Sequence, residues 1–552
     1  MNLSSIPQLA RNANRVREIL TVLARYGLAD WVSRIDLDLA RGILRVAAGR
    51  KLTDLTHETR VRRALTDLGT TFIKLGQMLS TRPDLVGPKL ARELTLLQDS
   101  APADPAATVR ATIETELGRP VAELFAEFDE TPIASASIGQ VHRARLHRGP
   151  VVAVKVQHPG IEARVRNDLE ILLTLAELAE TTLAEARPYQ PRATAAEFQR
   201  TLLRELDFTR EDRHLEEFRR HFTADPTVRF PAPYPDLSTG RVLTMEYLDG
   251  VKLSDVGRLR ADGADLNEVA RRGATVFLEM IFRDGFYHAD PHPGNLLLLR
   301  GGVLGMLDCG MVGRLDDVLR EGIEELLLAI IGKDAAGLTA VITRLGSVPP
   351  QLDRSALGVD LTDFLAYYGT VPLERFDLGG ALNDMTEIIR RYQIVLPAGL
   401  ALLIKVLVML EGTGRQLNPR FNLIELIRPY QVQLLKRRLS PRRYLRKMRR
   451  LAGEWEAVAT VLPEGIRSLV QQLQVGKLII HQEHKGLEPS VNRLVLGMLT
   501  SALFLGSAWM WSNNVLAVGG VSAVGVAGCA LSLVLGVRLL WAIRKSGRLD
   551  EK

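Results

Sequence analysis

Phe-Tyr-His-Ala-Asp-Pro-His-Pro-Gly-Asn, at residues 286–295, and Leu-Asp-Cys-Gly, at residues 307–310, are the stretches that decide the fold. Two short apolar runs lie between them, residues 296–299 and 303–307, joined by Arg-Gly-Gly. Apolar runs around a glycine turn are typical of a β-hairpin. Because a hairpin returns to where it began, we expect the two quoted stretches to lie side by side.

The hairpin would bring together three side chains that carry oxygen, those of Asp290, Asn295 and Asp308. Carboxylate and amide oxygens are hard ligands, which suit Mg²⁺ with nucleotide phosphates better than they suit zinc. In the phosphoryl-transfer template of protein kinases, an Asp shortly precedes a metal-binding Asn, and a second metal-binding Asp follows after a hairpin. All three parts are present here in that order.

Length and charge limit the classes of function. The chain has 552 residues, which predicts about two or three domains. Its net charge is +7, but nine basic residues and no acidic one fall within residues 436–450, so the rest is close to neutral. This distribution argues against a general nucleic-acid-binding surface. The two cysteines, Cys309 and Cys529, offer no disulfide framework, which predicts a reducing, cytosolic environment for the soluble part.

Two uncharged runs near the C-terminus, residues 494–511 and 515–537, are each long enough to cross a bilayer. Only residues 512–514 separate them, so we expect a transmembrane helical hairpin within residues 491–545. Basic residues flank the pair on both sides and none lies in the loop, which places both ends on the cytoplasmic side of the cytoplasmic membrane. The alternative is a very hydrophobic buried hairpin.

Two further features bear on the membrane. Gly519, Ala523 and Ala527 recur every fourth residue, which would let the second span pack closely against a neighbour. The basic run at residues 436–450 is interleaved with apolar residues, and within the region 421–490 it predicts a contact with anionic lipid. A nucleic-acid patch or a merely solvated helix remain the alternatives for that run.

Residues 1–104 have the apolar period of amphipathic helices, as at residues 14–26. In the segment 69–84, Lys74 and Gln77 share one face of a helix that Arg-Pro-Asp ends. Glycine inside a helix costs about 1 kcal/mol against alanine, so Gly76 indicates close approach of another backbone or of a ligand. The alternative is an ordinary packing glycine with solvated Lys and Gln.

The pattern changes after residue 130. A loop of small residues at 132–138 leads into an alternating strand, and a turn leads into a β-branched strand, residues 151–157, that contains Lys155. This order is similar to the nucleotide cradle of kinases, in which the strand lysine contacts phosphates and pairs with a helix glutamate. Lys155 could instead be a lysine that guards an edge strand against aggregation.

Residues 194–221 predict one long helix, opened by a capping box of Thr194 and Glu197. Glu211 or Glu205 on this helix is the natural partner for Lys155. A further strand, residues 242–250, contains Glu246 and ends in a hinge, and helices follow from residue 266 to 284 and again beyond Asp308 to about residue 417.

The expected fold class is α+β: a bilobal protein-kinase-like fold with an N-terminal helical extension and a C-terminal transmembrane hairpin. The expected domains are the extension (1–104), the smaller lobe (105–248), the helical lobe (249–420), the basic juxtamembrane region (421–490) and the two spans (491–545).

The combination of motifs resembles the UbiB/ADCK family of atypical protein-kinase-like proteins tied to quinone biosynthesis. Residues 74–77 resemble its KxGQ motif, residues 134–137 its alanine-rich nucleotide loop and residues 205–207 its ExD motif. Residues 288–295 resemble its catalytic loop and residues 308–310 its metal-binding turn. Each motif alone is weak, but five in the right order are very specific.

The resemblance implies a role for each matching residue. Asn295 and Asp308 would bind Mg²⁺, Asp290 would accept the proton of the attacking hydroxyl, and Lys155 would contact the phosphates of ATP and pair with Glu211. Lys74 and Gln77 would lie over the groove where a protein substrate would otherwise bind, with Glu205 and Asp207 nearby. The remaining nucleotide contacts implied are Ala134, Ser135, Ala136, Ser137 and Glu246.

Two positions depart from the usual kinase pattern. The loop over the phosphates has Ala and Ser where kinases have glycines, and Cys309 stands where kinases have Phe. Cys309 lacks the aromatic ring with which that Phe packs against the helical lobe. We therefore do not expect the Phe-in/Phe-out switching of kinases at this position.

The resemblance implies a membrane-anchored Mg-ATP-dependent ATPase or atypical kinase that supports ubiquinone or related lipid metabolism. Its expected partners are the membrane, isoprenoid-quinone precursors, quinone-biosynthesis proteins and a second copy of the chain, with no nucleic acid. A true protein kinase and a non-catalytic, nucleotide-gated scaffold are the competing functions.

Overall fold

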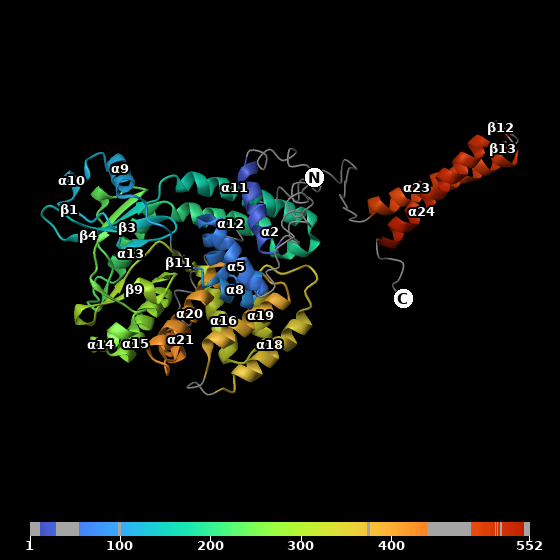
Figure 1. The fold of residues 1–552 in the computed structure, drawn as a ribbon. Coiled ribbons are helices and arrows are strands. Elements are labelled where there is room, and N and C mark those ends of the chain that lie inside the picture. The colour runs from blue at the N-terminus through green and yellow to red at the C-terminus, as the bar shows by residue number, and fades with distance from the viewer. Residues whose placement is uncertain are drawn as a thin grey trace, which may run out of the picture. The chain divides into compact units, whose positions relative to one another are not determined.

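The structure is a computed structural model, and it describes residues 12–28, 55–97, 101–371, 376–438, 487–513, 515, 517–518 and 521–545. The chain divides into two compact units, residues 1–440 and 441–552. The first unit holds a five-stranded sheet, a four-stranded sheet and most of the helices (Figure 1). Mixed helix and strand content confirms the predicted α+β class.

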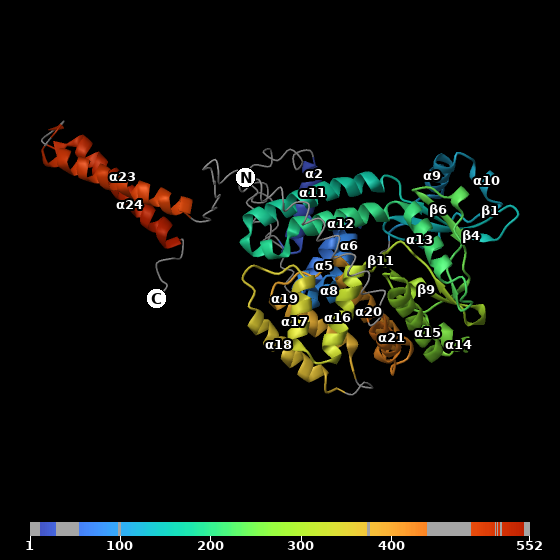
Figure 2. The ribbon, with the colours of Figure 1, turned by 180° about the vertical axis from the view of Figure 1, so that it is seen from behind.

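The N-terminal extension is helical, as the amphipathic pattern predicts. Its core contains Val16, Ile19, Leu68 and Phe72 and reaches Ile171 of a later helix. In both ribbon views α5 and α8 lie between the pair α11–α12 and the helices α18 and α19 (Figures 1 and 2). Its helices are α2 (Ala13–Arg25), α5 (His57–Leu68), α6 (Thr70–Ser80), α7 (Pro83–Val86) and α8 (Pro88–Leu94).

The smaller lobe is built on an antiparallel sheet in the order β1-β3-β4-β6, with β2 also paired to β3. The central strand β4 pairs with β3 through Val141↔Lys155 and with β6 through Lys155↔Leu243. The elements are α9 (Ala106–Leu117), α10 (Val121–Leu124), β1 (Glu127–Phe128), β2 (Ala134–Ser135), β3 (Gly139–Arg145), β4 (Val151–Gln157) and β6 (Val242–Glu246).

Three helices connect β4 to β6: α11 (Ile161–Thr182), α12 (Pro191–Glu205) and α13 (Phe208–His221). The prediction of one long helix over residues 194–221 is wrong, because the chain breaks at Leu206 and Asp207. The predicted capping box is also wrong, since α12 begins at Pro191 and Thr194 lies inside it. Proline fits the first helical position because its missing N–H would have no partner there, and this signal outweighs the Thr-x-x-Glu spacing.

The helical lobe surrounds a second sheet, β5-β10-β9-β7, and the pair β8-β11. A π-helix, η4 (Glu279–Asp284), leads from α15 (Leu266–Leu278) into β8 (Phe286–His288). The other strands are β5 (Val228–Arg229), β7 (Gly250–Lys252), β9 (Leu296–Leu299), β10 (Leu304–Met306) and β11 (Val312–Arg314). The other helices are α14 (Val256–Ala261), α16 (Asp317–Ile331), α17 (Ala335–Leu345), α18 (Arg354–Tyr368), α19 (Leu378–Arg391), α20 (Ala398–Leu417) and α21 (Leu423–Arg438).

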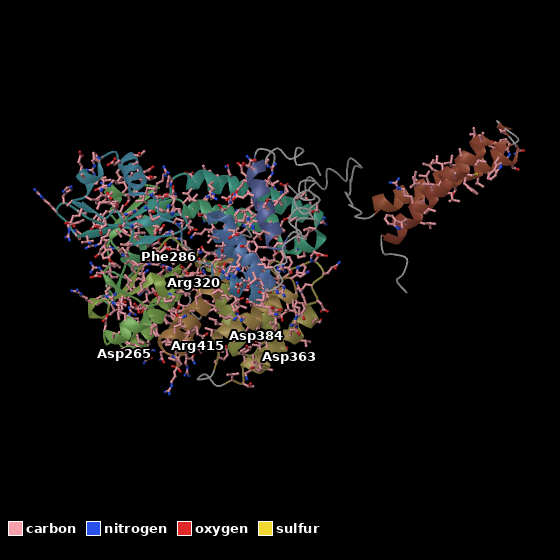
Figure 3. All side chains as sticks on the ribbon, in the orientation of Figure 1. Asp265, Phe286, Arg320, Asp363, Asp384 and Arg415 are labelled. Carbon is pink, nitrogen blue, oxygen red and sulfur yellow. The ribbon has the colours of Figure 1, made fainter. Side chains whose placement is uncertain are left out.

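The second unit contains a helical hairpin of α23 (Leu487–Ser512) and α24 (Ala523–Lys545), whose exposed side chains are largely apolar (Figure 3). Two stretches, residues 494–512 and 523–541, are long and apolar enough to cross a membrane. The second helix begins eight residues later than predicted, because β12 (Ala517–Val518) and β13 (Val521–Ser522) form a short antiparallel pair before it.

The two helices approach each other closely at Gly525 and Gly528, and the predicted packing of the small-residue repeat against a neighbour stays a prediction. A Cβ added at Gly525 would lie 2.9 Å from the Ser507 carbonyl oxygen, and one at Gly528 would lie 2.1 Å from Ser507 Oγ. The basic run at residues 436–450 lies mostly outside the described residues, and so does Gly519.

Candidate functional site

The predicted hairpin between the two motif stretches is confirmed. β9 and β10 are antiparallel, with Leu298 opposite Leu304. Gly301 and Gly302 both have positive φ, 80° and 77°, a conformation that glycine adopts without steric cost. The Leu307 amide donates to the Asn295 carbonyl at 2.8 Å, which returns the chain to the start of the hairpin.

Asp290 and Asn295 are held together directly. Asn295 Nδ2 donates to Asp290 Oδ2 at 2.8 Å, which leaves the amide oxygen of Asn295 as the atom able to bind a cation. His288 links the two ends of the hairpin, since its Nδ1 accepts from the Asp290 amide at 3.1 Å and its Nε2 lies 3.0 Å from the Leu307 carbonyl. Both contacts form only in the neutral tautomer that carries its proton on Nε2.

Asp308 follows this hairpin in an unusual backbone conformation, with φ at +53°. Left-handed geometry is strained for a residue other than glycine and often marks a functional site. Its Oδ1 lies 3.4 Å from Lys155 Nζ. The Lys155 ammonium lowers the pKa of Asp308 to about 2. More than half of this side chain, 56 %, remains exposed, so solvent screens the attraction.

Lys155 occupies the middle of the central strand, which excludes the alternative of an edge-strand lysine. Its ammonium lies 2.7 Å from Glu211 Oε2 on α13. Burial alone would lower the pKa of Lys155, but Asp308 and Glu211 outweigh burial and raise it. Burial raises the pKa of Glu211, whose side chain is only 4 % exposed and whose Oε1 has no hydrogen-bond partner among the described residues.

Of the two partners predicted for Lys155, Glu205 has another lysine instead. Lys74 Nζ, on α6, forms a charge-assisted hydrogen bond with Glu205 at the C-terminal end of α12. The first residue of the same helix, Thr70, donates to the carbonyl of Ser137 at 3.1 Å. The KxGQ helix therefore contacts both the ExD segment and the small-residue loop. Gln77 lies on this helix, partly exposed.

The two acids of the ExD segment have different tasks. Asp207 is the N-cap of α13, where its Oδ1 accepts from the Thr209 amide at 3.1 Å and from Thr209 Oγ1 at 2.7 Å. This cap begins the helix that carries Glu211. Asp207 therefore positions Glu211 through the helix, whereas Glu205 pairs with the extension.

The segment Ala134–Ser137 consists of β2 and the start of the turn into β3, and this turn is tight, with the Ala136 amide donating to the Gly139 carbonyl at 2.9 Å. His158 links this segment to Asp104, the last residue of the predicted extension. Its Nδ1 lies 2.6 Å from Asp104 Oδ2, and its Nε2 lies 2.8 Å from the Ala136 carbonyl oxygen.

For Gly76 the structure supports the alternative of a packing glycine: a Cβ there would lie 2.2 Å from Leu97 Cδ1 and 2.9 Å from Leu65 Cδ1. The carboxylate of Glu246 is bonded to Arg229 and to the Ala232 amide. Its contact with nucleotide stays a prediction.

The sequence analysis missed one group at the site and one ion pair that links the extension to the helical lobe. Lys405, on α20, places Nζ 3.9 Å from Asp290 Oδ1. Arg82 and Asp84 form a buried pair that also bonds to both backbone groups of Leu396, 3.1 Å from its carbonyl and 3.2 Å from its amide. The sequence signal that could have identified Lys405 is a lone lysine within an apolar helix. No such signal exists for Arg82 and Asp84, because their contacts with Leu396 join segments that are distant in the sequence.

The residues present fit a nucleotide with Mg²⁺. Within the described part of the chain no group of three or more His, Cys, Asp or Glu side chains forms a metal cluster. The oxygen donors of Asp308 and Asn295 are too few to enclose a cation alone, which suits Mg²⁺ because it keeps water and phosphate ligands. Beside them, Cys309 is buried, and burial raises the pKa of its thiol well above the usual value.

Three family models match this chain. The model of the ABC1 atypical kinase-like domain matches residues 96–342, that of the UbiB helical domain matches residues 361–422, and that of the ABC1/UbiB kinase-like C-terminal domain matches residues 480–545. A solved structure, the Rv3197–erythromycin complex from Mycobacterium tuberculosis, is 24 % identical, covers 69 % of this chain and 94 % of its own, and has a TM-score of 0.44.

Two curated relatives cover most of the chain. "Probable protein kinase UbiB" of Pseudomonas paraeruginosa is 35 % identical over 451 residues, 78 % of this chain and 83 % of the relative. "Probable protein kinase UbiB" of Aeromonas salmonicida is 32 % identical over 535 residues, 94 % of this chain and 97 % of the relative. The chain therefore belongs to the ABC1/UbiB family of atypical kinase-like proteins.

Proposed function

We propose that the protein is a membrane-anchored, Mg-ATP-dependent ATPase or atypical kinase that supports ubiquinone biosynthesis or related isoprenoid-lipid handling. The nucleotide-binding part of the proposal is supported by the connected set Lys155, Glu211 and Asp308, beside the Asp290–Asn295 pair. These are the parts that phosphoryl transfer requires, a cation for phosphates, metal ligands and a base.

The single observation that carries the choice of acceptor is the Lys74–Glu205 pair. It joins the extension helix α6 to α12, next to the helix that carries Glu211, where an extended protein substrate would need open space. Water, or a small substrate from the lipid side, is then the favoured acceptor.

In the proposed reaction, Mg²⁺ supplies charge neutralisation at the phosphates, with Asn295 and Asp308 as its protein ligands. Lys155 binds phosphate oxygens, and Glu211 and Asp308 keep the lysine oriented. Asp290 takes the proton of the attacking hydroxyl, and its hydrogen bond from Asn295 holds the carboxylate in place. His288 fixes the backbone of Asp290 through its Nδ1.

Membrane anchoring is supported by the two apolar helices. Only 6 % of the apolar stretch at residues 494–512 and 11 % of the stretch at residues 523–541 are buried within the protein. Exposed apolar surface of this extent needs a cover. The quinone pathway is supported by family membership.

The test uses purified full-length protein with Mg-ATP, with and without vesicles of anionic lipid. We expect phosphate release that rises with the vesicles and falls about 100-fold in Asp308→Asn, the scale of removing one electrostatic group from a transition state. Asp262→Asn, which changes an exposed aspartate after α14, is the matched control and should leave turnover unchanged. Absence of turnover under both conditions, while ATP still binds, would overturn the proposal.

The printed name of the relatives favours one second candidate, a protein kinase. Transfer of labelled phosphate to a protein in trans, lost in Asp290→Asn, would support it. A nucleotide-gated scaffold would instead keep its function in cells with Asp308→Asn and lose it when residues 491–552 are deleted.

A further inference from the structure

Lys405 is a lone lysine in the apolar helix α20, and its side chain is only 15 % exposed. Its Nζ lies 3.9 Å from Asp290 Oδ1, at the outer limit of an ion pair and too far for a hydrogen bond. It donates no hydrogen bond to any residue that the structure describes. A nearly buried ammonium with unused N–H groups costs several kcal/mol, unless an anion completes it.

The position of Lys405 is set by the docking of α20 along the catalytic loop. At the N-terminal end of α20, Tyr287 Oη donates to the Gly399 carbonyl at 3.4 Å. Two turns beyond Lys405, Thr413 Oγ1 donates to the Pro291 carbonyl at 3.2 Å. Contacts on either side of Lys405 thus hold its helix against the Asp290 segment.

The other lysines of the site already have carboxylate partners. Lys74 is bonded to Glu205, and Lys155 lies between Glu211 and Asp308. Burial lowers the pKa of Lys405, the Asp290 charge partly restores it, and Lys74 lowers it further. Lys405 is therefore the site cation that would gain most from an added negative charge.

We propose that Lys405 is a catalytic residue that binds the terminal phosphoryl group of the nucleotide beside Asp290. The inference rests on the proposed phosphoryl-transfer function. With water as acceptor, the water oxygen forms a bond to the terminal phosphorus, its proton passes to Asp290, and the bond to the ADP oxygen breaks with its electron pair left on ADP. Lys405 donates to the phosphoryl oxygens throughout.

The loop between Asp290 and Asn295 has no Lys or Arg of its own. Lys405 on α20 would supply positive charge beside Asp290 from the helical lobe. Lys155 supplies positive charge from the smaller lobe. The Lys405 ammonium would then contact both the terminal phosphoryl group and the Asp290 carboxylate. It would orient the base and the phosphoryl group relative to each other.

The experiment compares the affinities of the full-length chain for ATP and for ADP, measured with Mg²⁺ by calorimetry. Lys405→Met should weaken ATP binding about 10-fold or more, as expected when a charged hydrogen bond is lost, and leave ADP binding unchanged. Lys405→Arg should keep most of the preference for ATP. Lys252→Met, at an exposed lysine on β7, is the control for lost charge.

A second measurement does not depend on substitution. Acetic anhydride labelling of the wild-type protein, followed by mass spectrometry, should show Lys405 protected by ATP but not by ADP. Equal weakening of both nucleotides in Lys405→Met, or equal labelling with either nucleotide, would overturn the inference. A protein that shows the ATP-specific effects but no turnover would refute the proposed function and leave the role of Lys405 in binding intact.

Discussion

At the scale of single residues, the site depends on which acid each lysine meets. The sequence order suggested both Glu205 and Glu211 for Lys155, and only the packing distinguishes them. Lys74 and Glu205 are 131 residues apart in the chain, and no local pattern could pair them. The assignment leaves Glu211 as a buried carboxylate that depends on Lys155 for its counter-charge.

We predict that Lys155→Met destabilises the protein by about 3–5 kcal/mol near pH 8, the usual cost of breaking a buried pair. The loss should shrink towards pH 5. Burial already raises the pKa of Glu211, and without Lys155 it should rise further, so the folded state binds a proton that the unfolded state has released. Stability then falls as the pH rises above the unfolded value of about 4.3.

Urea unfolding between pH 5 and pH 8 measures this effect. Lys155→Arg keeps the charge and should show little pH dependence of its own. The double variant Lys155→Met with Glu211→Gln removes the titrating group and should flatten the profile. A loss that is equal at pH 5 and pH 8 would mean that Glu211 is not the group responsible.

At the scale of elements, much of the arrangement follows from local pattern. The hairpin of β9 and β10 and the lysine strand β4 were predicted because apolar alternation and glycine turns are local signals. The break between α12 and α13 was missed because Leu206 and Asp207 are compatible with a helix, and Asp207 acts as a cap only where tertiary packing turns the chain. The role of Gly76 likewise depends on Leu65 and Leu97 from neighbouring elements.

The link between the extension and the helical lobe is a second feature of this scale. Arg82 and Asp84, with side chains 4 % and 0 % exposed, form two hydrogen bonds with one another just after α6. They also bond to the backbone of Leu396, immediately before the segment that opens α20. The pair therefore connects the helix of Lys74 to the helix of Lys405. Phe286, where β8 begins, and Arg415, near the end of α20, are labelled in Figure 3.

We predict that Asp84→Ala lowers the free energy of unfolding by about 3–5 kcal/mol, because the buried Arg82 loses both hydrogen bonds to Asp84 and keeps only the Glu197 carboxylate, 3.7 Å away, as a counter-charge. The double change Arg82→Met with Asp84→Leu should cost clearly less than Asp84→Ala alone. Urea unfolding of the full chain in detergent gives both values. If the double variant is as unstable as the single one, the backbone bonds to Leu396, rather than the charge, account for the stability.

At the scale of the whole molecule, the candidate site and the two apolar helices belong to different compact units. Residues 1–440 contain all the predicted site residues, and the described residues of this unit form three apolar cores. The second unit contains the two apolar helices. Sequence alone identified both apolar stretches by length and lack of charge, but it misplaced the start of the second because Val515 to Ser522 are apolar enough to extend a helix. Amino-acid composition alone does not distinguish an apolar helix from a short apolar strand pair that precedes it.

We predict that deletion of residues 491–552 leaves ADP affinity within about 2-fold of the full chain, since the site and its cores lie in the first unit. The truncated protein, which keeps the basic run at residues 436–450, should still float with anionic vesicles at low salt and lose them at high salt, because each basic residue contributes about 1 kcal/mol at the surface. The full chain should stay with vesicles of either charge after alkaline carbonate, because hydrophobic spans do not depend on ionic attraction. Carbonate resistance in the truncated protein would show that the attachment lies within the first 490 residues, and the hairpin would then be a contact for another protein chain.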